Sequence, residues 1–389
     1  MNFFLIAGEP SGDRLGAALM AGLKVLCPDA RFHGVGGPMM QAEGLESLFP
    51  MEELSVMGLA EVVPKLRHLF ALKRRVAEAV VAMRPDALIT IDSPDFCLRV
   101  AKQVKAAAPE VLTIHYVAPS VWAWRPQRAE KMARHIDHVL ALLPFEPPYM
   151  EAAGMTCDFV GHPVVSEPVA TTDEAAAFRA RHGIAPNAPL LLLLPGSRRS
   201  EVGRLAPIFG EVLSRLADRL PGLRAVLPTV PHVAEALRAQ IADWPVAPVV
   251  LDPTEITDGF AVEKRAAFKA ADVALAASGT VSLELAATGT PMVISYDMNR
   301  ITWSIMRRKM RIDTVTLVNL VSETRAVPER LGPACTPETI APEVERLLTD
   351  RAARAAQAQA MAVTMDRLGK DGEAPGLRAA RSVLARIGG

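Results

Sequence analysis

The stretch at residues 190–202, LLLLLPGSRRSEV, decides the fold and lies near the middle of the chain. A short apolar run that stops at Pro195 is typical of a buried strand in a parallel sheet. The turn Gly196-Ser197-Arg198 comes next and opens a predicted helix, so backbone N–H groups, a hydroxyl and a guanidinium gather at one spot. This arrangement predicts a site for an anionic leaving group such as a nucleotide diphosphate. The alternative is an ordinary strand–turn–helix junction with surface arginines.

Length and composition restrict the class of protein. The chain has 389 residues, which is too many for one ordinary core and predicts two domains. It is 50% hydrophobic and 22% charged, as expected of a globular protein, and its formal net charge of zero gives no general attraction to nucleic acid. The four cysteines lack the spacing of a zinc site or a disulfide framework and fit a reducing cytosol.

No segment predicts targeting or membrane insertion. Residues 1–7 are apolar, but they reach Gly8-Glu9 too soon for a signal peptide and lack a basic start, so they predict a first strand. No run of about 18 uncharged apolar residues is present, and no helix is therefore expected to span a membrane.

The candidate catalytic carboxylates of the first half follow predicted strands. Glu9 comes soon after the strand at 3–7, and Asp92 ends the strand at 87–92. In open α/β sheets ligands bind at the carboxyl ends of the strands, so both carboxylates are well placed for chemistry. Asp92 is the better candidate for a reacting base. For Glu9 the alternative is that it only fixes its turn.

Other polar residues near these turns are predicted to cap helices. Ser11 or Asp13 can cap the helix after the first strand, and Asp95 can cap the helix after Asp92. The pair Asp92 and Asp95 lacks the further ligands that would make a metal site convincing.

An aromatic loop follows the predicted strand at 111–114. Residues 115–125, HYVAPSVWAWR, contain two of the four tryptophans of the chain, Trp122 and Trp124. Aromatic rings and an arginine on a loop suit a wall against a ligand. For each tryptophan the alternative is that it fills the core.

The second half repeats the alternation of strands and helices. We expect its strands at 190–194, 223–227, 247–251, 272–276 and 291–296. The turn Ser278-Gly279-Thr280 again opens a helix, whose N–H groups can meet a phosphate. Glu284 lies one turn into this helix and can accept hydrogen bonds from a ribose diol. For Ser278 and Thr280 the alternative is ordinary helix capping.

Two segments combine a basic face with an apolar face. Residues 57–83, which Pro64 is expected to break into two pieces, and residues 299–311 both suit a helix that lies on an anionic membrane surface. For both segments the alternative is an ordinary helix with a solvated basic face. Between the two halves, prolines and an alanine-rich stretch after Glu167 predict the linker.

Ten motifs, taken together and in this order, resemble those of the lipid-A-disaccharide synthases, glycosyltransferase family 19. They are GEPSGD at 8–13, GVGGPMM at 34–40, MEELSVMGLAEV at 51–62, IDSPDF at 91–96, HYVAPSVWAWRPQR at 115–128, LPFE at 143–146, GHP at 161–163, LPGSRRSEV at 194–202, ASGTVSLE at 277–284 and LVNL at 317–320. The tail after about residue 335 matches in helical character more than in motif.

The resemblance implies an α/β protein of the GT-B fold, with two Rossmann-like domains whose parallel sheets face a central cleft. The first domain, at 1–166, would carry the acceptor side, the catalytic base and a membrane-facing segment. The second domain, at 167–389, would bind the UDP-sugar. Its C-terminal helices would pack back toward the first domain or against a partner subunit in a homodimer.

The resemblance also implies the reaction. An inverting transfer would join UDP-2,3-diacylglucosamine to 2,3-diacylglucosamine 1-phosphate and give the β(1→6)-linked lipid A disaccharide 1-phosphate and UDP. The protein would need no cofactor and no metal, and would bind no nucleic acid. It would work as a peripheral protein on the inner face of the cytoplasmic membrane of a Gram-negative bacterium.

Matching positions imply roles for single residues. Asp92 matches the family's proposed catalytic aspartate, Glu9 matches another acidic position of the cleft, and Arg198 matches a position that contacts UDP. The two predicted helix starts would add N–H donors for the diphosphate. Glu284 on the ribose follows from nucleotide-sugar GT-B enzymes in general, and Asn319 of the LVNL motif is expected to line the site.

Two other functions stay open from the sequence. Another GT-B enzyme that acts on UDP-sugars, such as an epimerase or a transferase with a soluble acceptor, shares the UDP site. It does not account for the two basic and apolar segments. A nucleotide-sugar-binding or membrane-docking protein without catalysis would not need intact Asp92, Glu9 and Arg198.

Overall fold

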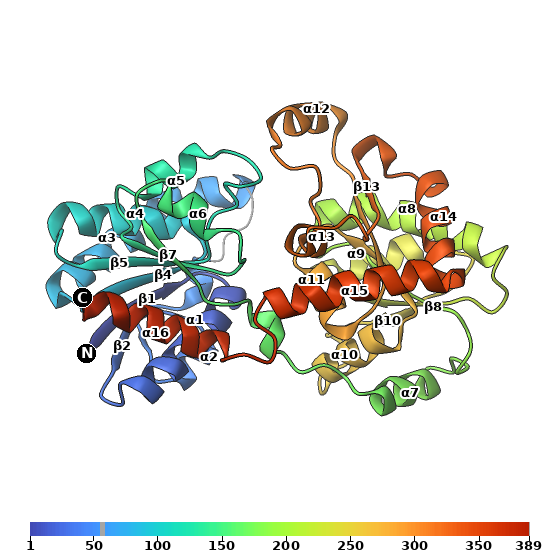
Figure 1. Cartoon of the computed structure of the whole chain (residues 1–389), viewed down its shortest axis with the longest axis horizontal. Coiled ribbons are helices and arrows are strands. Elements are labelled where there is room, and N and C mark those ends of the chain that lie inside the picture. Colours follow the sequence, from blue (N-terminus) through green and yellow to red (C-terminus); the bar gives the residue numbers. More distant parts are fainter. Residues whose placement is uncertain (55–58, 389) are drawn as a thin grey trace. The chain divides into compact units, whose positions relative to one another are not determined.

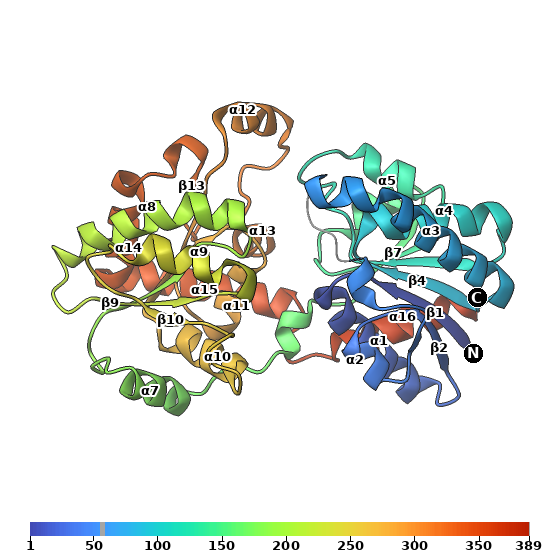
Figure 2. The same cartoon turned by 180° about the vertical axis from the view of Figure 1, so that it is seen from behind.

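The computed structural model describes the backbone of residues 1–54 and 59–388, and the side chains of these residues apart from 59–66. The chain divides into two compact units, Met1–Ser166 with Leu368–Gly389, and Glu167–Arg367. Each unit is built on one parallel sheet with helices packed against it (Figures 1 and 2). The predicted α/β architecture with two parallel sheets is therefore confirmed.

The first unit has a sheet in the order β3-β2-β1-β4-β5-β6-β7. Its strands are β1 (Asn2–Ala7), β2 (Arg31–Val35), β3 (Glu46–Ser47), β4 (Ala87–Ile91), β5 (Leu112–Tyr116), β6 (His138–Ala141) and β7 (Thr156–Phe159). Its helices are α1 (Pro10–Leu26), α2 (Pro38–Ala42), α3 (Leu59–Met83), α4 (Pro94–Ala107), α5 (Gln127–Met132), α6 (Pro147–Glu151) and α16 (Pro375–Ile387), with short 3₁₀ turns η1 (Met51–Glu53) and η2 (Pro163–Ser166).

Strand β1 shows how this sheet is buried on both faces. Phe3 and Leu5 pack into one cluster with residues of α1 and α16, whereas Phe4 and Ile6 pack into another with residues of α3 and α4. Successive side chains of a strand point to opposite faces, so a continuous apolar run is what a sheet covered on both sides requires.

The last helix, α16, belongs to the first unit, so the second unit ends at Arg367 rather than at the end of the chain. Glycines let α16 and α1 approach closely, because a Cβ on Gly376 would lie 2.4 Å from the carbonyl oxygen of Ala18. Polar contacts add to this packing. The Ser382 hydroxyl lies 2.8 Å from His138 Nε2 and donates to Asp158 at 2.7 Å. These contacts tie α16 to β6 and β7.

The expected helix break at Pro64 is wrong. Helix α3 runs from Leu59 to Met83 without interruption. Pro64 lies in its second turn, where the missing N–H removes one hydrogen bond near the start of the helix. The later turns bury Leu72, Val76 and Val80 against the sheet, and this apolar packing favours one continuous helix.

The second unit has a sheet in the order β10-β9-β8-β11-β12-β13. Its strands are β8 (Leu190–Leu194), β9 (Arg224–Pro228), β10 (Val249–Leu251), β11 (Val273–Ala277), β12 (Met292–Tyr296) and β13 (Glu329–Leu331). Its helices are α7 (Thr172–Arg181), α8 (Arg199–Ala217), α9 (Pro231–Ile241), α10 (Phe260–Ala270), α11 (Val281–Thr288), α12 (Arg300–Lys309), α13 (Leu317–Ser322), α14 (Pro337–Thr349) and α15 (Arg351–Arg367), with a 3₁₀ turn η3 (Gly332–Ala334). All five leucines of β8 are buried, as the leucine run predicts.

Both sheets reverse their direction of winding in the middle. In the first unit the reversal lies between β1 and β4, and in the second unit it lies between β8 and β11. Helices that follow the two central strands run to opposite sides of the sheet, which leaves a crevice at the carboxyl ends of these strands. Each unit therefore has one preferred place for a ligand.

Candidate active site

The ligand edge of the first unit brings Glu9 and Asp92 to neighbouring strand ends. Strands β1 and β4 are parallel neighbours, with Ala7 paired to Ile91. Their following turns touch, because a Cβ on Gly8 would lie 2.8 Å from Ser93 Oγ. Both candidate carboxylates thus lie at the switch point, as the sequence predicts.

The backbone at this edge is strained. Asp92 has φ 48° and Ser93 has φ 43°, although neither is glycine, and Val117 after β5 has φ 85°. A β-branched residue at positive φ is a conformational outlier. Hydrogen bonds hold the strained chain in place, since Asp92 N–H donates to Tyr116 O at 2.9 Å and Val117 N–H to Leu140 O at 3.0 Å. Backbone strain of this kind gathers at ligand and catalytic sites.

Asp92 lines a cavity of about 200 Å³ at this edge, which we call the Asp92 pocket. Burial raises the pKa of the Asp92 carboxyl, and a hydrogen bond from the Ser93 backbone opposes the rise in part. A carboxylate with a raised pKa is a stronger base. The other lining residues are Pro94, His115, Val117, Ala118, Pro119, Ser120, Trp124 and Arg128.

Two walls of the Asp92 pocket carry polar or cationic groups. His115 Nδ1 lies 2.8 Å from Thr90 Oγ1. Burial lowers the pKa of this histidine to about 4, so its ring is neutral at pH 7. Trp124 lies beneath two guanidinium groups, at 4.0 Å from Arg125 and 5.6 Å from Arg128.

The structure separates the roles of the two loop tryptophans. Trp124 lines the Asp92 pocket, whereas Trp122 is buried. Trp122 packs edge-on against Phe145 at 5.1 Å and donates Nε1–H to Glu146 at 3.2 Å. The wall interpretation therefore fits Trp124, and the core interpretation fits Trp122.

Glu146 is a buried carboxyl that sequence reasoning did not single out. It is 3% exposed and accepts hydrogen bonds from the backbone of Leu142 at 3.2 Å and Leu143 at 2.9 Å as well as from Trp122. Burial raises its pKa to about 7. The only signal in the sequence was its place in LPFE, because its donors are two backbone groups just before it and Trp122 of the aromatic loop.

The expected caps of α1 and α4 are wrong. Asp13 lies inside α1 and instead accepts hydrogen bonds from the backbone of Gly37, Met39 and Met40 at 2.9–3.0 Å, so it caps α2. Helix α4 already begins at Pro94, which places Asp95 within its first turn. The GEPSGD and GVGGPMM motifs are therefore joined by the Asp13 carboxylate.

In the second unit, the two predicted phosphate turns share one edge. Strands β8 and β11 are parallel neighbours, with Leu194 paired to Ala276. The turns that follow them therefore come from adjacent strand ends. Each contains a glycine with positive φ, 105° at Gly196 and 159° at Gly279. The turns lie at the switch point of this sheet.

Glu201 fills the anion position of the first turn in this structure. Its carboxylate accepts from the backbone of Ser197 and of Arg198, both at 3.3 Å, and lies 3.0 Å from the Arg198 guanidinium. Gly196 has φ 105°, and a Cβ there would also lie 2.6 Å from the same carboxylate, so this position favours glycine. The sequence identified these donors as a place for an anion but did not identify the internal anion.

The polar side chains at and after the second turn differ in their partners. Thr280 makes no side-chain cap of α11, and it is Ser282 that donates its hydroxyl, to Gly279 O at 2.9 Å. The capping alternative for Thr280 is therefore wrong, and Gly279 and Thr280 are exposed at the start of the helix. Glu284 is half-buried and pairs with Lys264 at 2.8 Å.

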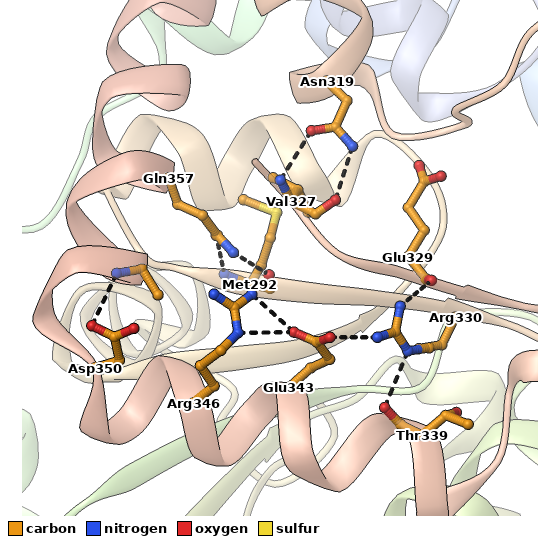
Figure 3. A network of polar contacts seen from close by, with 11 residues as sticks. Met292, Asn319, Val327, Glu329, Arg330, Thr339, Glu343, Arg346, Asp350 and Gln357 are labelled. Carbon is orange, nitrogen blue, oxygen red and sulfur yellow. Dashed lines mark hydrogen bonds and ion pairs between the residues drawn. The ribbon is translucent and has the colours of Figure 1, made fainter. Parts of the chain in front are cut away.

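Asn319 lies elsewhere than expected. Its side chain is 1% exposed, and it donates to Thr314 Oγ1 at 3.2 Å and to Val327 O at 2.9 Å. Its amide oxygen accepts from Val327 N–H at 3.0 Å (Figure 3). These bonds fix the chain that leads into β13. The expectation that Asn319 lines the site is corrected, because so buried a side chain presents no atom to a ligand.

Comparison with known sequences assigns the family. The sequence profile described as Lipid-A-disaccharide synthetase matches residues 3–376. The lipid-A-disaccharide synthase of Ruegeria pomeroyi is 64% identical over 393 residues, which cover 100% of this chain and 96% of that protein. The chain belongs to the lipid-A-disaccharide synthase family. A second member, from Rhodospirillum centenum, is 49% identical over 98% of this chain and 93% of its own length. The chain is thus a glycosyltransferase of lipid A biosynthesis.

Comparison with solved structures confirms the GT-B fold of this synthase family member. The UDP-GlcNAc 2-epimerase from Neisseria meningitidis, solved with UDP-GlcNAc, covers 100% of both chains with a TM-score of 0.67 at 12% identity. The calicheamicin glycosyltransferase covers 100% of this chain and 98% of its own, with a TM-score of 0.58 at 15% identity. At such low identities the likeness extends to the fold alone.

The described residues of this synthase family member contain neither a helix able to span a membrane nor a cluster of metal ligands. Among the helices that the structure describes, none combines the length and the apolar character needed to cross a membrane. Over the same residues, no group of three or more His, Cys, Asp or Glu side chains is arranged to hold a metal ion.

Proposed function

We propose that the protein transfers 2,3-diacylglucosamine from UDP-2,3-diacylglucosamine to the 6-hydroxyl of 2,3-diacylglucosamine 1-phosphate. The products are the β(1→6)-linked disaccharide 1-phosphate and UDP. The observation that carries this proposal is the Asp92 pocket, where a half-buried carboxylate with a raised pKa sits on a strained turn at the switch point. Membership of the lipid-A-disaccharide synthase family supports the choice of sugars.

The proposed chemical step is one in-line displacement with inversion. Asp92 accepts the proton of the acceptor 6-hydroxyl as that oxygen forms its bond to the anomeric carbon. The bond from this carbon to the β-phosphate oxygen breaks on the opposite face, and its electron pair leaves with UDP. Glu9 is the second candidate for the base, since it follows the neighbouring strand.

The leaving diphosphate would be held by the second unit. The Arg198 guanidinium and the N–H groups of Ser197 and Arg198 are the donors, and the start of α11 at Gly279 and Thr280 supplies the others. Glu201 must release its contacts with the first set when a diphosphate binds, because both anions need the same donors. Glu284 would accept from the ribose hydroxyls beside Lys264.

The acylated substrates place the enzyme at a membrane, and we propose that α12 contacts the anionic inner face of the cytoplasmic membrane. Helix α12 has no buried residue, and its Ile301 and Ile305 are 72% and 47% exposed. Arg307, Arg308 and Lys309 form its last turn. An exposed apolar pair beside three cations suits the headgroup region of anionic lipids.

The other basic segment and the homodimer stay predictions. Of the segment 57–83, residues 57 and 58 and the side chains of 59–66 lie outside the described residues. The described part of α3 exposes Phe70 beside Lys73, which lies 5.1 Å above its ring.

Vesicle binding tests the proposed membrane contact. Replacing Arg307 and Arg308 by glutamate should weaken sedimentation with anionic vesicles, while affinity for UDP stays unchanged. Exposed Arg351 and Lys370, replaced together by glutamate, are the matched control for the change in charge. Equal sedimentation of both double variants would exclude α12 as the contact.

A product assay tests the proposed reaction. Purified protein is mixed in detergent with UDP-2,3-diacylglucosamine and labelled 2,3-diacylglucosamine 1-phosphate, with and without EDTA, and the products are separated by thin-layer chromatography. A labelled disaccharide in both reactions supports the proposal and its independence from metal. No disaccharide from protein that binds UDP would contradict it and favour a UDP-sugar enzyme with a soluble substrate.

A further inference from the structure

A second cavity of about 490 Å³ lies in the first unit beside the Asp92 pocket. Its apolar walls are Leu54 after η1, Leu69 and Phe70 on α3, and Phe96 on α4. Its volume falls within the range of about 300–1,000 Å³ that is usual for small-molecule sites. Phe70 is 50% exposed here, so a ligand in this cavity would cover apolar surface that is now in contact with water.

The charged groups around this cavity do not favour an anion. Lys73 and Arg99 line it, but so do the carboxylates of Glu9 and Asp95. The two positive and two negative groups leave no net charge. A phosphate would meet two carboxylates here, whereas an uncharged apolar group would meet none of this repulsion. The balanced charges give a phosphate no net attraction, and an acyl chain would instead cover the apolar walls of the cavity.

The two cavities adjoin at the strained turn. Pro94 lines both of them, while Asp92 lines the smaller and Ser93 lines the larger. A molecule with a polar ring in the Asp92 pocket would therefore need to carry its apolar arm only past this turn to reach the larger cavity. The acceptor of the proposed reaction has this form, since acyl chains are attached to its sugar ring.

We propose that this larger cavity, the acyl cavity, holds one acyl chain of the acceptor while the acceptor sugar lies in the Asp92 pocket. The inference rests on the proposed function and adds a subsite to it. Burial of the chain positions the sugar, so part of the binding energy of a remote group is used to orient the 6-hydroxyl toward Asp92. Leu69 and Phe96 then act as specificity-determining residues for chain length.

Leu69→Trp tests the acyl cavity by filling it. The acceptor is supplied in three forms with long, medium and short acyl chains, the shortest being soluble without detergent or vesicles. We expect kcat/KM for the long chain to fall about 10–200-fold, as for a pocket that loses room for methylene groups, and kcat/KM for the shortest chain to change little. Val25→Trp, an exposed position on α1 that lines neither cavity, is the matched control.

The outcomes separate the acyl cavity from the proposed function. If wild-type protein forms no disaccharide from the long-chain substrates, the proposed function fails. If wild-type protein is active but Leu69→Trp changes kcat/KM equally for every chain length, or for none, the acyl cavity is wrong. Unchanged UDP affinity and an unchanged melting temperature establish that the variant is folded.

A direct label gives a second readout that does not depend on turnover. An acceptor with a photoreactive group at the end of one acyl chain is bound to wild-type protein and irradiated, and the labelled peptides are identified by mass spectrometry. We expect label within residues 67–73 of α3 or 94–99 of α4. Label confined to other segments would overturn the proposal even if the chain-length series agreed with it.

Discussion

The strand-end turns of the two units are built in opposite ways. After β4, positive φ values of 48° and 43° fall on Asp92 and Ser93. Because these residues carry a Cβ, each such backbone conformation costs roughly 1–3 kcal/mol. After β8, the positive φ of 105° falls on Gly196, where the strain is absent. A turn that presents the Asp92 carboxylate cannot have glycine at that position. The turn after β8 presents backbone N–H groups, and so glycine is sufficient.

This difference predicts a division of labour between the turns after β4 and β8, which single substitutions can test. A side chain at the first turn would move a proton, and main-chain donors at the second would hold a leaving group. Substitutions at the first turn should therefore change the rate, whereas substitutions at the second should change the affinity for UDP.

The largest effect is expected at Asp92. Asp92→Asn removes the proton acceptor but keeps the shape, so kcat should fall by roughly 10²–10⁴-fold, the usual contribution of general base catalysis. UDP affinity should stay the same. Initial rates and a UDP titration measure the two quantities, with exposed Asp29→Asn as the control for loss of one carboxylate. A wild-type rate in Asp92→Asn would remove this residue from the mechanism.

The next largest effect is expected at Arg198. Arg198→Ala removes a charge-assisted hydrogen bond to the diphosphate, so the Kd for UDP should rise about tenfold to a hundredfold. Calorimetric titration of UDP measures the change. Its neighbour Arg199, for which no ion pair is found in the described chain, provides the control variant Arg199→Ala. Equal losses in both variants would point to a general effect of positive charge and against a specific contact.

Glu146 tests whether the buried carboxyl that is bonded to Trp122 makes a pH-dependent contribution to stability. Its pKa is raised from an ordinary 4.5 to about 7, so the folded protein binds this proton more tightly than the unfolded chain does. Its contribution to stability is therefore complete below pH 4.5 and is lost as the pH rises through 7. Over that pH range the contribution of Glu146 to the free energy of unfolding should fall by roughly 1–3 kcal/mol.

The glutamine in Glu146→Gln cannot ionise, and so this variant should lack the pH-dependent contribution of Glu146 to stability. Thermal unfolding followed from pH 4.5 to 8 in both proteins measures the difference between their slopes. Parallel curves would show that the Glu146 carboxyl does not titrate in this range.

The smallest effect is expected at Glu201. Glu201→Gln keeps an acceptor for the backbone of Ser197 but removes the negative charge that occupies the anion position. Affinity for UDP should rise about twofold to fivefold, the scale of an exposed ion pair. The matched control is Glu211→Gln, on the same helix and paired with Arg215. A weaker affinity in Glu201→Gln would show that the carboxylate orders the turn more than it competes with the ligand.

Much of the fold could be predicted because its central strands carry their own signal. The leucine run at 190–194 coincides with β8 and the apolar run at 3–7 falls within β1, since strands buried on both faces are continuously apolar. Strands β3 and β13 were not predicted from the sequence. These are edge strands of two and three residues, and their pairing depends on neighbours far along the chain.

The candidate site was predicted in its strand ends but not in its supporting contacts. Asp92 and Arg198 follow strands, and a strand pattern locates such positions. Glu146, Glu201 and Gln357 instead accept hydrogen bonds from backbone groups, the first two from residues only three or four positions earlier. Gln357 on α15, for example, accepts from Met292 N–H at 2.8 Å and donates to Met292 O at 3.0 Å (Figure 3). Gln357 and Met292 are 65 residues apart, so no local pattern marks this pair, because the tertiary fold brings it together.

Hydrogen exchange tests the division of labour most directly. Amide exchange is measured by mass spectrometry in the full protein alone, with UDP, and with a non-reacting acceptor analogue. We predict that UDP slows exchange at 196–201 and 278–284, and that the acceptor analogue slows it at 92–99 and 117–124. Protection of the first unit's segments by UDP, with none at 196–201 or 278–284, would contradict the account.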